Sequence, residues 1–378
     1  MKGKPGSLYI HVPFCAKKCI YCDFFSIPYD ETRAVRYMDS AVKELEMTRD
    51  RASVLDTIYI GGGTPTTMPA GSLVMIARKI KDLFEVSDKA EVTIEANPGT
   101  IDQEKARALH DAGISRFSIG AQSFDDDQLR LLGRIHTSEE TVSAIGAVRS
   151  AGVPNISIDL IYGIPGQTHD GWLHTIDEAV GLYPAHISAY ELTPERGTPL
   201  YELISQGRIA KPDEENIVRM YYSAIEKLEA EGYGHYEISN FARPGFECRH
   251  NLNYWNRGEY IGIGAGAHGF IGGIRTRNAC DVDKYINAIE GGRLPVEESS
   301  EISREDALKE AVFLGLRKME GLNITEIGQA FGVDIVKAAR ELIVEGLLRS
   351  EGESLRLTRK GVVVSNTVIA ELFERMGL

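Results

Sequence analysis

The first half of the chain alternates short β-rich runs with amphipathic helical stretches, and this alternation restricts the fold more than any other feature. The β-rich runs cover residues 8–14, 57–63, 91–98, 116–123, 156–163 and 186–193. Helical patterns over 33–49, 73–84, 103–112, 138–151 and 172–182 separate most of them. Strands that alternate with helices pair in parallel through right-handed crossovers. The sequence therefore predicts an α/β fold built on a parallel sheet.

Polar and glycine-rich segments follow five of these runs at the point where the strand ends. They are residues 61–66, 95–98, 122–124, 159–165 and 191–194. Any one of them can be a simple turn. In (β/α) barrels, however, the carboxyl ends of the strands converge on the active site. We therefore predict a partial six-stranded (β/α) barrel over residues 1–200, open on one side, with its functional site at these strand ends.

Two further regions follow the predicted barrel. Residues 201–299 contain a long helix at 213–232, a strand-like run at 235–241 and a glycine-rich stretch at 261–269, whose glycines we expect to allow close backbone approach near the barrel mouth. Residues 300–378 show three helical patterns, a hairpin-like run and a last helix, which together predict a winged-helix-like domain. This region has 11 Lys or Arg against 13 Asp or Glu residues. A packing or lid module is therefore favoured over a DNA-binding one.

Three cysteines lie within eight residues, at Cys15, Cys19 and Cys22. Four cysteines would saturate a zinc ion or an ordinary four-iron cluster. Three can hold only three irons of a [4Fe–4S] cluster, which leaves the fourth iron open to a small molecule. A zinc site with a distant fourth ligand and a set of unrelated reduced thiols are the alternatives. The apolar and aromatic residues around the cysteines favour the cluster, because such surroundings tune its potential.

Composition limits the partners and the compartment. The net charge of −13 argues against extended nucleic-acid binding, which needs a basic surface. No apolar stretch approaches about 20 residues, so we expect no membrane span, although peripheral membrane contact is compatible with the sequence. Residues 1–5 lack the apolar core of a signal peptide. Cluster thiolates need a reducing compartment, so we expect a cytoplasmic protein.

Several motifs together resemble one family. They are Tyr9-x-His-x-Pro-Phe-Cys-x3-Cys-x-Tyr-Cys22, Gly61-Gly-Gly-Thr-Pro-Thr66, Asp159-Leu-Ile-Tyr-Gly-Ile-Pro165 and the C-terminal winged region. Over essentially the whole chain, they are similar to the oxygen-independent coproporphyrinogen III oxidase-like branch of the radical S-adenosylmethionine (SAM) superfamily. The resemblance implies a [4Fe–4S] cluster on Cys15, Cys19 and Cys22, whose open iron is chelated by the amino and carboxylate groups of SAM.

The resemblance also implies a set of SAM contacts: Tyr9, Tyr21, Gly62, Gly63, Thr64, Glu95, Gln122, Arg134, Asp159 and Thr193. The chemistry of the side chains agrees with these roles. A guanidinium such as that of Arg134 can pair bidentately with the SAM carboxylate. Carboxylate and amide groups suit the ribose hydroxyls, and glycine carbonyls suit the amino group. The simpler interpretation of each charged residue is a structural ion pair or a turn cap.

Two departures separate the chain from the coproporphyrinogen dehydrogenases of this branch. Their motif has a further cysteine where this chain has Phe24, and they have an N-terminal extension where only seven residues precede Leu8. Within the branch, the sequence is most similar to the heme chaperones. By that resemblance, the run His250-Asn-Leu-Asn-Tyr-Trp255 matches an H-N-x-x-Y-W signature for heme.

The resemblance assigns heme binding to His250, Asn251, Tyr254 and Trp255. A neutral histidine can ligate iron, and the two aromatic rings offer flat apolar faces to a porphyrin. A histidine beside aromatic residues is otherwise a common packing group, and Cys248 is an alternative soft ligand. We expect Cys280 to be a buried small hydrophobe. We expect His11 to pack or hydrogen-bond beside the cysteine loop.

The predicted function is therefore that of a heme chaperone. It would deliver heme to heme-requiring proteins such as respiratory cytochromes, with an electron donor for the cluster as a further partner. The cluster and SAM would serve assembly or gating, and no residue is assigned a catalytic role. The alternative is a coproporphyrinogen III dehydrogenase that uses a 5′-deoxyadenosyl radical.

Overall fold

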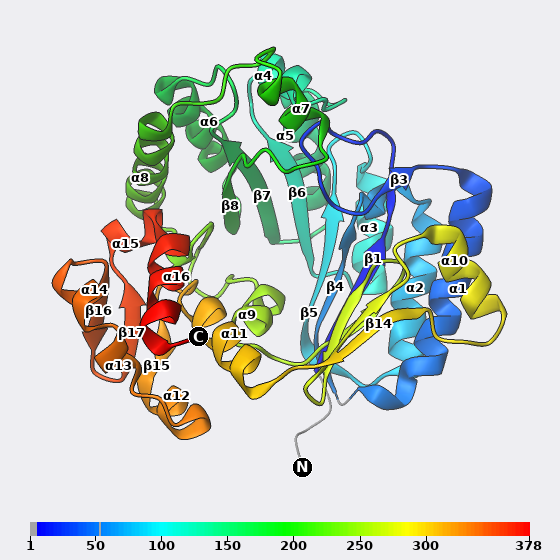
Figure 1. Ribbon diagram of the computed structural model, residues 1–378. Helices are drawn as coiled ribbons and strands as arrows, with labels where there is room; N and C mark the ends of the chain where they lie inside the picture. Colours follow the sequence, from blue (N-terminus) through cyan, green and yellow to red (C-terminus); the bar gives the residue numbers. More distant parts are fainter. Residues whose placement is uncertain (1–5, 53) are drawn as a thin grey trace.

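A curved nine-stranded sheet forms the centre of the protein (Figure 1). The computed structural model describes residues 6–52 and 54–378, so the prediction about a signal peptide in residues 1–5 lies outside the described residues. The strand order is β11-β1-β4-β5-β6-β7-β8-β10-β9. In that order the strands are β11 (Ile261–Ile263), β1 (Ser7–Val12), β4 (Leu55–Gly62), β5 (Val86–Ala96), β6 (Arg116–Gln122), β7 (Asn155–Tyr162), β8 (His186–Glu191), β10 (Asn240–Ala242) and β9 (Gly234–Glu237).

The six strands expected from the sequence are β1, β4, β5, β6, β7 and β8, and each is parallel to its neighbour. Helices between them cover the outer face of the sheet (Figure 1). They are α1 (Glu31–Thr48), α2 (Ala70–Leu83), α3 (Gln103–Ala112), α5 (Ser138–Ser150) and α6 (His169–Gly181). The short helix α4 (Asp126–Leu131) lies beyond the carboxyl ends of the strands (Figure 1), and the chain also has the short 3₁₀ turns Arg49–Arg51 and Pro65–Thr67. The predicted partial barrel of parallel strands is confirmed.

Side chains that cap helix ends set several of these boundaries. Asp30 and Asp102 each accept a hydrogen bond from the backbone N–H three residues on, as N-caps do. Thr137 and Glu140 form a reciprocal capping box at the start of α5. These signals are local in the sequence, so the predicted helix positions agree with the structure to within about a turn.

The region after the barrel extends both edges of the sheet. It contains α7 (Pro199–Ser205), α8 (Glu214–Ala230), α9 (Arg249–Trp255), α10 (Val282–Glu290) and a second sheet of β12 (His268–Ile271), β13 (Ile274–Asn278) and β14 (Val296–Glu301). β11 pairs with β1 in parallel, and β10 pairs with β8 in an antiparallel manner. The expected close approach in the glycine-rich stretch is confirmed, because a Cβ at Gly264 would lie 2.5 Å from the carbonyl oxygen of His11.

The C-terminal region is a compact helical module with a small sheet. Its elements are α11 (Arg304–Gly315), β15 (Leu322–Asn323), α12 (Ile324–Phe331), α13 (Ile335–Ala338), α14 (Arg340–Val344), β16 (Leu348–Glu351), β17 (Ser354–Leu357), α15 (Arg359–Val363) and α16 (Ser365–Met376). The sheet has three strands where the hairpin predicted two, since β15 joins it. The third of the helical patterns predicted in this region is broken into two short helices, α13 and α14.

Backbone hydrogen bonds join this module to the free edge of the large sheet. Ile238 donates to Arg317, and Met319 donates to Tyr236. In Figure 1 the module, drawn in orange and red, lies beside α8 and α9 on the side away from α1 and α2. The division at residues 200 and 299 stays a prediction, because the strands of the middle region belong to the same sheet as the barrel. No helix in residues 6–52 and 54–378 is long and apolar enough to cross a membrane.

Candidate functional site

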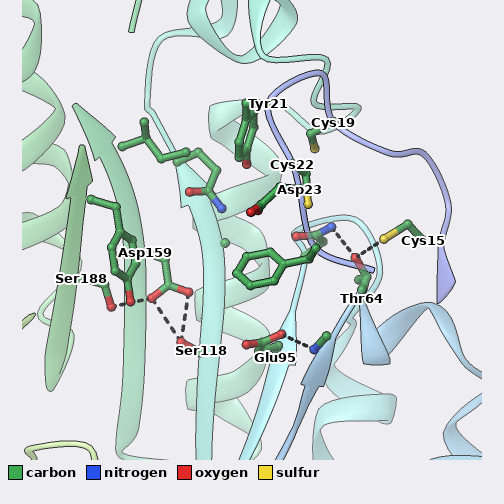
Figure 2. A pocket seen from close by; sticks show the side chains of 18 of the residues that line it. Cys15, Cys19, Tyr21, Cys22, Asp23, Thr64, Glu95, Ser118, Asp159 and Ser188 are labelled. Carbon is green, nitrogen blue, oxygen red and sulfur yellow. Dashed lines mark hydrogen bonds between the residues drawn. The ribbon is translucent and has the colours of Figure 1, made fainter. Parts of the chain in front are cut away.

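A cavity of about 400 Å³ occupies the interior of the curved sheet and opens at the carboxyl ends of its parallel strands. Figure 2 shows the labelled cysteines on one wall and the group of Asp159, Ser118 and Ser188 on the opposite wall. Strand ends and the cysteine loop thus meet at one place, as the sequence predicted. The cavity brings residues from five strands of the large sheet within reach of a single small ligand.

The cysteine loop is held at its base by a short pair of strands. β2 (Phe14–Cys15) pairs with β3 (Ile27–Pro28), which brings the two ends of the loop together. All three cysteines line the cavity. The predicted role of His11 is confirmed: its Nδ1 is 3.0 Å from Tyr9 Oη and its Nε2 is 2.9 Å from the carbonyl oxygen of Phe25. His11 therefore supports the loop from below.

The sulfur atoms have polar neighbours. Thr64 Oγ1 donates to Cys15 Sγ at 3.7 Å, and Arg134 Nη1 donates to Cys19 Sγ at 3.5 Å. Burial raises the pKa of the Cys15 and Cys22 thiols, so their thiolates need a nearby cation. Within the described part of the chain, no three His, Cys, Asp or Glu side chains are placed so that they could hold a single metal ion. Three thiols on one wall with charged and hydroxyl donors fit the donor set of an iron–sulfur cluster.

The cavity gathers most of the residues that the resemblance assigned to SAM. Those that line it are Tyr21, Gly62, Gly63, Thr64, Glu95, Gln122, Arg134, Asp159 and Thr193. Tyr9 is the exception, because it lies below the loop, where its hydroxyl contacts His11. Asn251 also lines this cavity, whereas the other three residues assigned to heme do not.

Glu95 organises the glycine turn at the end of β4. It accepts one hydrogen bond from Tyr59 Oη and one from the Gly62 backbone N–H, both at 2.9 Å. Burial raises the pKa of Glu95 to about 7, so its carboxyl is poised to exchange a proton near neutral pH. Gly62 has φ of +115°, which a side chain at this position would strain. The turn therefore presents backbone atoms directly to the cavity.

Arg134 lies between the cysteine loop and the strand ends. Its Nη2 donates to Asn97 Oδ1 and to the Gly120 carbonyl oxygen, both at 2.6 Å. Its buried Nε has no hydrogen-bond partner among the described residues. A Cβ at Gly120 would lie 3.3 Å from the guanidinium, so glycine leaves room for this approach. A cation held here with an unused donor suits a carboxylate ligand.

Sequence reasoning missed several residues of the cavity, and a period of two along the strands could have found them. On β6, Arg116, Ser118 and Gly120 were missed, and they line the cavity together with the predicted Gln122 because alternate side chains face the same side. The same holds for Asn97, which follows β5 and lies two residues after the predicted Glu95. Asp159 accepts hydrogen bonds from three serines, Ser118, Ser157 and Ser188. These hydrogen bonds fix the position of the Asp159 carboxylate in the cavity wall.

His250 lies at the other end of the barrel, where the strands begin, and it is completely buried. Its Nδ1 is 2.8 Å from Thr57 Oγ1, and its Nε2 is 2.8 Å from Tyr254 Oη. Burial and the charge of Arg116 lower the pKa of His250 to about 3, so the ring is neutral. The neutral ring is the form that ligates iron. Ligation requires that one of these two hydrogen bonds be broken.

α9 therefore forms the floor of the barrel. The Glu91 carboxylate accepts hydrogen bonds from the backbone N–H groups of Arg249 and His250, at 3.1 Å each, which fixes the start of the helix. Tyr254 and Trp255, at the end of the same helix, line a second cavity of about 260 Å³ on the outside of the barrel. One short helix thus contacts both cavities, through Asn251 on one side and these two aromatic residues on the other.

The two remaining cysteines differ in their surroundings. Cys248 is buried, and its Sγ contacts Glu91 Oε1 at 3.6 Å. Burial and the nearby carboxylate raise the pKa of Cys248 to about 12, which disfavours the thiolate that an iron ligand needs. Cys280 is exposed, so its prediction as a buried hydrophobe was wrong. It lies in the connection between β13 and α10.

Replacing Arg134 by alanine is expected to weaken SAM binding, because it would remove the predicted charge-assisted pair with the SAM carboxylate. Such a pair contributes about 1.5–3 kcal/mol, which corresponds to roughly a 10- to 150-fold loss of affinity. Glu95→Ala should also weaken binding, since it releases the glycine turn. Isothermal titration of the anaerobically reconstituted protein with SAM measures both effects. Arg130→Ala, an exposed change in the neighbouring helix, is the control, and unchanged affinity in the Arg134 and Glu95 variants would contradict the assignment.

Comparison with known proteins identifies the relatives of this chain. The Radical SAM superfamily model matches residues 9–179, and the HemN C-terminal domain model matches residues 302–364. The heme chaperone HemW of Bacillus subtilis (strain 168) is 37% identical over 369 residues, which cover 96% of this chain and 97% of the relative. HemW of Mycobacterium tuberculosis (strain ATCC 25618 / H37Rv) is 34% identical over 377 residues, 98% and 96% of the two chains.

Among solved structures, the coproporphyrinogen III oxidase HemN of Escherichia coli, a radical SAM enzyme, superposes with a TM-score of 0.86. The superposition covers 98% of this chain and 90% of that one at 22% sequence identity. At this identity the likeness establishes the fold. It agrees with the partial barrel and the C-terminal module described above.

Proposed function

This chain belongs to the HemW family of heme chaperones, and on that premise we propose that it binds heme and hands it to heme-requiring proteins. The observation that carries the proposal is the position of α9. This helix holds the H-N-x-x-Y-W run and separates the strand-end cavity from the aromatic cavity outside the barrel. A ligand bound at the outer face of α9 would therefore affect the binding of a ligand in the barrel, because both contact the same helix.

In this proposal a [4Fe–4S] cluster is held by Cys15, Cys19 and Cys22. SAM lies in the cavity beside it, with its carboxylate at Arg134 and its ribose toward the carboxylates of Glu95 and Asp159. When bound, the cluster supplies an open iron that anchors SAM. The protein's own part is to hold Arg134 through Asn97 and Gly120, and to keep Glu95 and Asp159 fixed by hydrogen bonds.

Heme is the cargo, and His250 is its proposed axial ligand. The ring is already neutral, and the interaction that it loses on binding iron is a single hydrogen bond to Tyr254 or Thr57. Release of the Tyr254 hydroxyl would free the ring of Tyr254 to lie against the porphyrin. Asn251 lies on the inner side of the same helix and lines the SAM cavity, so a displacement of Tyr254 and α9 would also move a residue of that cavity.

The partners and the compartment follow from the same chemistry. Exchange of heme with respiratory cytochromes on the cytoplasmic side would require contact with proteins at the membrane. The cysteine thiolates require a reducing compartment, and an electron donor would set the oxidation state of the cluster. In this proposal the cluster and SAM serve to assemble the protein or to gate the transfer of heme.

One paired experiment tests this function against the dehydrogenase alternative. The anaerobically reconstituted protein is titrated with heme, and a parallel sample is incubated with coproporphyrinogen III, SAM and a reductant. We expect a saturable Soret band in the first sample and no protoporphyrinogen in the second. The reason is that Phe24, which lines the cavity, stands where the dehydrogenases have a further cysteine, and a phenyl ring has none of the chemistry of a thiol. Formation of product without heme binding would establish the enzyme instead.

A further inference from the structure

We propose that the outer cavity between α9 and α11 holds the edge of heme that carries the propionates, and that Arg257 and Arg275 pair with them. The inference rests on the proposed function, since it names where the cargo lies. The cavity is separate from the one at the strand ends. It is bounded by the end of α9, the turn that follows it, the β12–β13 hairpin and α11 of the C-terminal module.

Four aromatic residues line the cavity. They are Tyr254, Trp255, Tyr260 and Phe270. Tyr254 and Tyr260 pack edge to face, with ring centroids 4.7 Å apart. Rings in this arrangement present flat apolar surface with little mobility, which suits a planar macrocycle. The volume of about 260 Å³ lies below the roughly 300–1,000 Å³ of sites that enclose a whole ligand, so the cavity holds one edge of the macrocycle.

Two arginines share one carboxylate at this place. Arg257 Nε and Arg275 Nη2 each donate to an oxygen of Glu310, on α11, at 2.8 Å. Both guanidinium groups also lie over the ring of Phe270, at 5.0 and 5.1 Å from its centroid. Two cations against one carboxylate leave an excess positive charge beside an apolar wall. A planar apolar ligand with two carboxylates complements this arrangement.

The donors of this cluster are only partly used by Glu310. Each guanidinium has five N–H donors, and Glu310 accepts one from each arginine. Trp255 adds a buried indole N–H that no described residue accepts. A buried donor without a partner is costly, and a carboxylate oxygen would satisfy it. A propionate carboxylate would therefore compete with Glu310 for the two guanidinium groups.

The position of His250 agrees with this orientation of heme. Tyr254 links the two places, because its hydroxyl is 2.8 Å from His250 Nε2 while its ring lines the cavity. A macrocycle whose edge lies at Arg257 and Arg275 extends toward Tyr254 and, once that ring is displaced, toward the imidazole. The iron and the propionates would thus be held by two adjacent parts of the same wall.

The test compares heme with heme dimethyl ester, in which both propionates are neutral. Each compound is titrated into the wild type and into the Arg257→Gln/Arg275→Gln double variant, and binding is followed by the Soret band. The wild type should bind heme about 10- to 100-fold more tightly than the ester, as expected for charge-assisted pairs. The double variant should lose this preference while its affinity for the ester is unchanged.

Two further variants distinguish pairing from a structural role. Arg359→Gln removes an arginine that also has one carboxylate partner, Glu226, and one aromatic partner, Tyr222, but lies away from the cavity, so it should keep the full preference. Glu310→Gln keeps both arginines and removes their competitor, so the preference for heme should increase severalfold. This variant gives an independent result if the double variant does not fold.

The outcomes separate this inference from the proposed function. If the double variant weakens heme and ester equally, or keeps the wild-type preference, the propionate assignment is wrong while heme binding stands. If the wild type binds neither compound, the proposed function itself fails. A preference that disappears in the Arg359 variant as well would indicate a general charge effect and would also overturn the assignment.

Discussion

Replacing Cys15, Cys19 and Cys22 together by alanine should reduce the iron content of the reconstituted protein from about four atoms per chain to nearly none. In the proposed cluster each thiolate would bind a different iron, and the Arg134 and Thr64 donors cannot replace a ligand. Single replacements should also abolish the cluster, since two thiolates do not hold the cube stably. Iron and sulfide are assayed after anaerobic reconstitution, together with the visible absorption of the cluster.

The two other cysteines provide the control for this experiment. The Cys248→Ala and Cys280→Ala variants should keep the full iron and sulfide content, since neither residue lines the cavity. The reduced wild-type cluster should change its electron paramagnetic resonance spectrum when SAM is added. A triple variant that still binds about four irons would refute the assignment, and so would a spectrum that saturating SAM leaves unaltered.

Replacing His250 by alanine should abolish or strongly shift the Soret band of bound heme while the iron and sulfide of the cluster remain. The imidazole is the proposed axial ligand, so its loss removes the strongest bond to the iron. Tyr254→Ala and Trp255→Ala should have smaller effects, because the porphyrin face is shared among several rings. Cys248→Ala should leave the band unchanged, since its thiol is held protonated.

A matched histidine controls for the loss of buried packing. His186 is buried in the same barrel, with Nδ1 2.8 Å from Ser157 Oγ and Nε2 2.8 Å from Tyr236 Oη. His186→Ala removes the same side chain and the same kinds of hydrogen bond, so it should cost similar stability and keep the heme spectrum. A normal spectrum in the His250 variant together with loss in the Cys248 variant would move the ligand two residues upstream.

Local signals in the sequence were sufficient to predict the strands and most of the helices of the barrel. The alternation of apolar strands with amphipathic helices predicted β1 and β4 to β8, because side-chain periodicity and capping depend on neighbours within a few residues. The spacing of Cys15, Cys19 and Cys22 placed a three-thiol site on one loop for the same reason. The C-terminal sheet was predicted with one strand too few, because β15 has only two residues and is recognisable only by its pairing with β17.

The site was predicted less completely than the fold. Arg134, Glu95 and Asp159 were named from the resemblance, and all three line the cavity. Asn97 was not named, although it links Thr64 to Arg134. Asparagine after a strand is typical of a turn, so nothing local distinguishes it from a structural residue.

The sequence by itself determined the parallel barrel, the three-cysteine loop and the presence of an H-N-x-x-Y-W run, since each depends on residue types at short spacing. Only the tertiary structure decided that His250 is buried at the floor of the barrel and that Glu310 lies between Arg257 and Arg275. These contacts join residues that are 35 to 193 positions apart. Contacts between side chains that are distant in the sequence depend on how whole helices and strands pack together, and no local sequence pattern predicts that packing.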